Sequence, residues 1–68
     1  MEVYQVQLWP NGKWDGKPYK KVEAPSEKAA AEKIFGRPLA TRGSNFKIRA
    51  RVRPFGRLIS EATVFYEP

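Results

Sequence analysis

Residues 46–53 read Phe-Lys-Ile-Arg-Ala-Arg-Val-Arg, so apolar and cationic residues alternate without interruption. Successive side chains of an extended strand point to opposite faces of a sheet. The alternation therefore predicts a strand with one apolar and one cationic face. Phe46, Ile48, Ala50 and Val52 form the apolar face, and Lys47, Arg49, Arg51 and Arg53 form the cationic face.

Three other stretches also have strand character. Residues 3–9 and 19–24 alternate in the same way, and residues 58–66 supply a fourth strand after the basic one. Between the second and third strands, Ser26 is a favourable N-cap for a helix over residues 27–35, and Gly36 suits its end. The sequence predicts an α+β fold, a single small domain over residues 1–68 in the order β-β-α-β-β. Two antiparallel hairpins form a four-stranded sheet with one helix packed on one face.

The apolar positions also predict the register of the first hairpin. If Val6 pairs with Ala24 and Leu8 with Val22, the turn is a three-residue loop, 14–16. Gly16 then stands where such a loop needs a positive φ.

The second hairpin follows the same rule. Val52 is expected to pair with Leu58 and Ile48 with Ala62, around the loop Pro54-Phe55-Gly56. Thr63, Glu61, Ile59 and Arg57 would then lie beside the cationic residues, with Glu61 opposite Arg49.

A single helix covers one side of a four-stranded sheet, so the other side is expected to be open, polar and basic. Trp9, Ile59 and Phe65 are the expected apolar residues on that side, with Trp9 across from Lys21. Tyr19 is expected at the core or its rim, and Phe55 at a hairpin tip is expected either to anchor a partner or to cap the core.

The amino-acid composition argues against several classes of protein, among them metalloproteins, membrane proteins and enzymes. The chain has 68 residues with no Cys and no His, so we expect no disulfide, metal or cofactor. No apolar run approaches the roughly 20 residues of a membrane span, and residues 1–8 do not resemble a signal peptide. The expectation is a cytoplasmic protein with no membrane partner. Without a catalytic His, Cys or paired acids, we also expect no enzyme and assign no catalytic residue.

The positive charge is confined to the second half of the chain. Residues 1–32 hold five cations and five anions, whereas residues 33–68 hold eight cations and two anions, which accounts for the whole net charge of +6. Six of those eight cations are Arg, the side chain suited to bidentate phosphate contacts and to stacking. A partner that carries phosphates is therefore favoured.

One loose family resemblance points the same way. The chain resembles the archaeal ribosomal LX-type proteins, which are small and basic and have a similar element order. The resemblance rests on Tyr4, Val22, Ala24, Ser26, Ala30, Gly43-Ser44 and the basic strand. The loop at Trp14 and the hairpin at Pro54 depart from that pattern, so no residue role is transferred. The resemblance implies an RNA partner.

Three interpretations of the basic face follow. In the first, it binds RNA or single-stranded DNA, with phosphates on the cations and a base stacked on an aromatic ring. The candidate nucleic-acid-binding residues are Trp9, Lys21, Arg42, Lys47, Arg49, Arg51, Arg53 and Arg57. In the second, it is a protein interface, most simply of a homodimer, that buries Trp9, Ile59 and Phe65. In the third, the charges only keep strand edges from aggregating.

Overall fold

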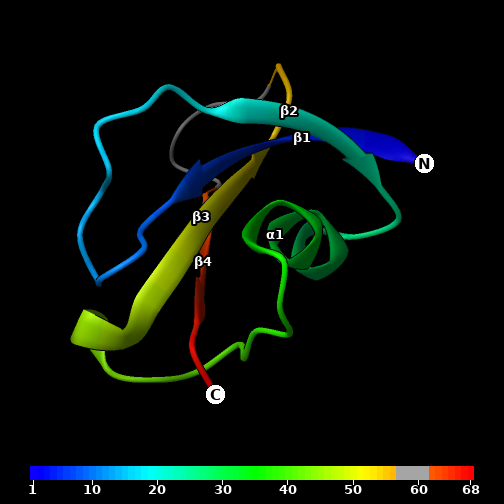
Figure 1. Ribbon diagram of the computed structural model, residues 1–68. Coiled ribbons are helices and arrows are strands. Elements are labelled where there is room, and N and C mark those ends of the chain that lie inside the picture. The colour runs from blue at the N-terminus through cyan, green and yellow to red at the C-terminus, as the bar shows by residue number, and fades with distance from the viewer. Residues whose placement is uncertain (57–61) are drawn as a thin grey trace.

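The strand β1 (Glu2–Leu8) lies inside a four-stranded antiparallel sheet whose order is β2-β1-β3-β4. The other strands are β2 (Lys20–Ala24), β3 (Ile48–Pro54) and β4 (Thr63–Tyr66). The computed structural model describes residues 1–56 and 62–68. The helix α1 (Glu27–Phe35) packs on one face of the sheet, and a short 3₁₀ helix, η1 (Asn45–Lys47), precedes β3 (Figure 1). The expected α+β fold is confirmed.

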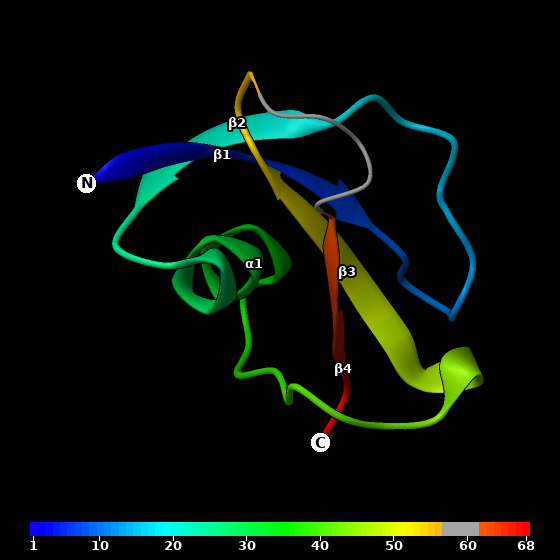
Figure 2. The same ribbon diagram turned by 180° about the vertical axis from the view of Figure 1, so that it is seen from behind.

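The helix α1 begins and ends at the predicted residues. The Ser26 hydroxyl accepts a hydrogen bond from the Ala29 backbone N–H at 3.1 Å, and Gly36 ends the helix with a φ of 91°. Ala30 and Ala31 are fully buried. Because these side chains are small, the helix can lie close to the sheet; Figure 2 shows the same arrangement from behind.

Replacing the cap is expected to weaken the domain measurably. Ser26→Ala removes the acceptor for the Ala29 N–H and should lower the free energy of unfolding by about 1 kcal/mol. Urea unfolding followed by circular dichroism measures the change. Ser44→Ala is the matched control, because Ser44 precedes η1 without a side-chain capping bond. Equal losses in the two variants would contradict a specific capping role for Ser26.

The core lies between α1 and the sheet. Val6 and Val52 from the two central strands are the largest fully buried side chains, and Leu39 from the connection after α1 joins them. Tyr4 also belongs to this cluster. Burial, helped by the negative charges of Glu2 and Glu27, raises the pKa of the Tyr4 hydroxyl above its ordinary value. The phenol therefore stays neutral at physiological pH.

The predicted register of the first hairpin was wrong by four positions. Val22 pairs with Tyr4 and Ala24 with Glu2, so the connection runs from residue 9 to residue 19. An even shift leaves every side chain on its predicted face, which is why alternation alone cannot detect it. Gly12 closes a turn by donating its N–H to the Trp9 carbonyl at 3.2 Å. The chain thus leaves the sheet at Trp9 rather than at a loop over residues 14–16.

The second hairpin differs more. Thr63 pairs with Val52 and Phe65 with Ala50, because a register shift interrupts the ladder between Ile48 and Ala50, as a β-bulge does. The shift is odd, so Thr63 and Phe65 turn to the helix side; the Thr63 hydroxyl lies 3.3 Å from a Glu27 carboxylate oxygen. The predicted partners Leu58, Ile59 and Glu61 lie outside the described residues. The pairing of Thr63 with Val52 overturns the predicted three-residue loop.

The start of β3 also differs from the prediction. Phe46 was expected to point into the core, but it lies in η1 with 72% of its surface exposed. The strand begins only at Ile48. At the far edge of the sheet, Ala40 and Tyr66 exchange two backbone hydrogen bonds of 2.7 and 2.8 Å. The connection after α1 therefore borders β4.

Candidate nucleic-acid interface

The face of the sheet opposite α1 carries the side chains that alternate with the core positions. Lys21 on β2 pairs with Gln5 on β1, and Gln5 pairs in turn with Arg53 on β3. In the next row along β1, Gln7 pairs with Arg51. Polar and cationic groups thus cross three adjacent strands in register.

Two cation–π contacts link the outer strands of this row. The Lys21 Nζ lies 4.3 Å from the centre of the Phe55 ring, and the Arg53 guanidinium carbon lies 4.1 Å from the centre of the Tyr19 ring. The Arg53 Nε also donates to the Gln5 Oε1 at 3.0 Å. Both contacts pass across β1, since each joins a residue on or beside β2 to one on or beside β3. We call these five residues the cross-strand cluster.

The cross-strand cluster combines charge with accessible aromatic surface. Phe55 is 51% exposed and Lys21 is exposed, whereas Arg53, Gln5 and Tyr19 are half-buried. A cation–π contact at an exposed site is worth about 0.5 to 1 kcal/mol, which positions a cation without neutralising its charge. The cluster therefore offers two oriented positive charges and one open ring.

Arg49 has a different role from the other cations of β3. Its side chain is only 14% exposed, and its Nε and Nη2 donate to the Glu67 Oε2 at 3.1 and 2.7 Å. Its Nη1 donates to the backbone carbonyls of Phe46 and Ile48 at 3.1 and 3.0 Å. With four donations made inside the protein, Arg49 ties η1 to the C-terminal residues. It was predicted as a ligand contact, and its geometry is that of a structural residue.

Trp9 lies beyond the end of β1 and is half-buried. Its indole N–H donates to the Gln7 Oε1 at 3.1 Å, and its backbone N–H donates to the Arg49 carbonyl at 2.8 Å. The residue opposite Lys21 is Gln5, so the predicted pairing of Trp9 with Lys21 was wrong. Gln7 itself is only 8% exposed, so the face opposite α1 is not open along its whole length.

Among the described residues, the other predicted site residues lie away from the cross-strand cluster. Phe65 is 3% exposed and belongs to the core under α1, so it cannot serve as a surface anchor. Lys47 is exposed on η1 and Arg42 is exposed in the connection before it. Arg57 and Ile59 lie outside the described residues. The structure thus joins Lys21 and Arg53 in one place, with Arg51 in the next row.

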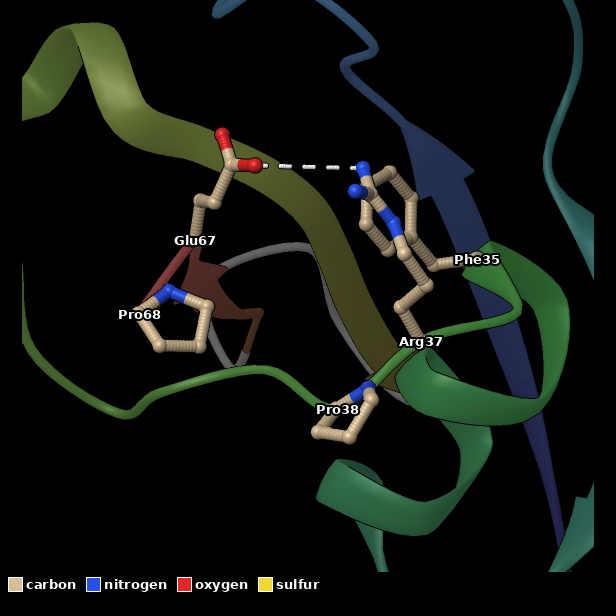
Figure 3. A pocket seen from close by; sticks show the side chains of 5 residues that line it. All are labelled: Phe35, Arg37, Pro38, Glu67 and Pro68. Carbon is tan, nitrogen blue, oxygen red and sulfur yellow. Dashed lines mark ion pairs between the residues drawn. The ribbon is translucent and has the colours of Figure 1, made fainter.

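Hollows lie at two places on the described residues. One of about 280 Å³ lies at the C-terminal end of α1, where Phe35, Arg37, Pro38, Glu67 and Pro68 line it. Figure 3 shows the Arg37 side chain beside the Phe35 ring and joined to Glu67, with the Nη2 to Oε1 distance at 3.8 Å. Its charged groups are paired with each other.

The second hollow, of about 300 Å³, includes Lys21 of the cross-strand cluster in its lining. Val3, Val22 and Glu23 complete it. This hollow lies beside the cross-strand cluster, on β1 and β2.

Two further findings concern the described ranges, 1–56 and 62–68. These ranges hold no group of three or more acidic residues placed to ligate a metal ion. None of their helices is long and apolar enough to cross a membrane.

Tyr19, like Gln5 and Phe55, belongs to the cross-strand cluster but was not among the predicted site residues. It was expected at the core or its rim, yet it stacks against Arg53 from just before β2. Its position in the sequence could have indicated this. Tyr19 is two residues before Lys21, and residues two apart in an extended chain point to the same face of a sheet. Comparison with known proteins adds no further assignment: no family model, no curated protein and no solved structure matches the chain.

Proposed function

We propose that the protein binds single-stranded nucleic acid, RNA or DNA, through the cross-strand cluster. The observation that carries the proposal is the pair of cation–π contacts across β1, which holds Lys21 and Arg53 beside exposed aromatic surface. Positive side chains that follow a phosphate backbone, together with rings on which bases stack, are the two features that single-strand binding needs. The protein acts as a binding module without catalytic activity.

Each part of the cross-strand cluster has a distinct task. Lys21 and Arg53 contact phosphate oxygens, and Arg51 in the neighbouring row adds a third cation. Phe55 is 51% exposed and offers its ring to an unpaired base, a contact worth about 1 to 3 kcal/mol. Bases inside a duplex are already stacked on each other, so this arrangement favours single strands.

The charge of the whole chain supports the same proposal. Its net charge of +6 attracts a polyanion from a distance and raises the rate of encounter at low salt. Between Lys33 and Ser60 the sequence contains no acid that would oppose this attraction.

A salt series tests the proposal directly. Fluorescence anisotropy with labelled single-stranded RNA, single-stranded DNA and duplex should show log affinity falling with log salt concentration. Three to five phosphate contacts predict a slope of about −2 to −3.5 for a single strand. We expect weaker binding to the duplex. Absence of binding at low salt to all three probes would refute the proposal.

A protein interface is the second candidate for this surface, because exposed Phe55 stands beside the hollow that Lys21 lines. Its simplest form is a homodimer. Sedimentation of the wild type and Phe55→Ala separates the two candidates. A dimer that becomes monomeric in the variant, together with no oligonucleotide binding, would favour the protein interface. A monomer in both cases would remove its support.

A further inference from the structure

Phe46 is an exposed aromatic residue that the cross-strand cluster does not include. It lies in η1 with 72% of its surface exposed, more than Trp14 or Phe55 at 51% each. Burying a Phe side chain would contribute about 1.5 to 3 kcal/mol, and the fold forgoes that gain here. The position of Phe46 therefore invites a functional explanation.

The backbone beneath this ring is firmly held. The Phe46 carbonyl accepts a hydrogen bond from the Arg49 Nη1 at 3.1 Å, and the next N–H, of Lys47, donates to the Ser44 carbonyl at 2.8 Å. Gly12 packs against the same carbonyl so closely that a Cβ on it would lie 2.4 Å from the oxygen. The backbone that carries the Phe46 ring is therefore held in place.

Exposed cations flank Phe46 in the sequence. Lys47 follows it on η1, and Arg42 precedes it in the connection from α1; both are exposed. The acid Glu67 also lies here: its backbone N–H donates to the Lys47 carbonyl at 2.9 Å, and its carboxylate is paired with Arg49. A fixed, exposed aromatic ring between exposed cations repeats the chemistry of the cross-strand cluster at the other end of β3.

We propose that Phe46 is a second stacking point for the same nucleic-acid strand, which the protein binds along β3 from Phe55 to Phe46. This inference rests on the proposed function. The seven residues of β3 span roughly 23 Å at 3.3 Å per residue. At the 3.4 Å per nucleotide of a stacked strand, about seven nucleotides cover that length. The ligand is therefore a single-stranded tract, and a trinucleotide is too short to reach both rings.

Labelled oligothymidylates of three and eight nucleotides test the inference. The wild type should bind the octamer at least about fivefold more tightly than the trimer, since one additional stacked base contributes about 1 to 3 kcal/mol. Phe46→Leu keeps an apolar side chain but removes the ring. We expect it to weaken octamer binding about five- to tenfold and trimer binding less than twofold.

Two further variants make the result specific. Phe46→Trp restores a ring and should restore octamer affinity, whereas Phe55→Leu should weaken binding of both lengths. An unchanged urea midpoint confirms that Phe46→Leu is folded, as expected for a residue so exposed. Octamer binding that is insensitive to Phe46→Leu would overturn the second stacking point and leave the proposed function standing. If the wild type binds neither oligomer, the proposed function itself fails.

Discussion

Phe65→Ala is expected to lower the free energy of unfolding by about 3 to 5 kcal/mol, as removal of a buried aromatic ring generally does. Phe65 is 3% exposed and packs in the core between β4 and α1. A chain of 68 residues has a total stability of about 3 to 10 kcal/mol, so this loss is a large part of the total. Urea unfolding followed by circular dichroism measures the loss.

Phe46→Ala is the matched control for this experiment. It removes the same ring from a residue that is 72% exposed and should change the free energy of unfolding by no more than about 0.5 kcal/mol. A Phe65→Ala protein with normal stability that dissociates from a dimer would show that Phe65 is a surface anchor, contrary to its position in the core.

The double variant Lys21→Gln/Arg53→Gln should lower affinity for a single-stranded oligonucleotide about 25-fold at 0.1 M salt. Each lost phosphate contact removes about 0.7 from the slope of log affinity against log salt, so two contacts remove about 1.4. Both side chains belong to the cross-strand cluster. Anisotropy across a salt series measures affinity and slope together.

The double variant Lys28→Gln/Lys33→Gln is the matched control, because it removes the same number of positive charges. Both lysines are exposed on α1, away from the cross-strand cluster, and their loss lowers the net charge by the same amount. We expect its slope to stay within about 0.3 of the wild type, because charges farther away than the Debye length are screened. Equal losses in the two double variants would mean that net charge alone drives binding and that the cluster has no special role.

The helix was predictable to the residue because the signals that bound it are local. Ser26 caps the helix through a side chain three positions away from its partner, and Gly36 takes the left-handed conformation that its lack of a Cβ allows. Alternation likewise located the strands, since a period of two is visible within a few residues.

Register was not predictable, because it depends on pairings between distant residues. The irregularity between Ile48 and Ala50 shifts β4 by an odd number of positions and carries Phe65 from the predicted surface into the core. The structural role of Arg49 depends on its ion pair with Glu67, and the shifted pairing of β3 with β4 brings these two residues together. No local pattern encodes either contact.

The candidate site was predictable in part. The alternation placed Arg51 and Arg53 on the face away from the core, and the first hairpin was expected to place Lys21 there too. The contact of Tyr19 with Arg53 depends on how the chain enters β2 after a connection of several turns. The path of this connection is determined by tertiary contacts, so the contact between Tyr19 and Arg53 could not be predicted from the sequence.

The central place of β1 has a consequence for how the chain folds. β1 pairs with both β2 and β3, and the second pairing joins Tyr4 to Pro54. Closing so long a loop costs entropy before the contact forms, and such non-local pairing slows folding. During synthesis, β1 has no second neighbour until residues 48–54 have been made. Until then one edge of β1 stays open, so the nascent chain is vulnerable to pairing with other strands.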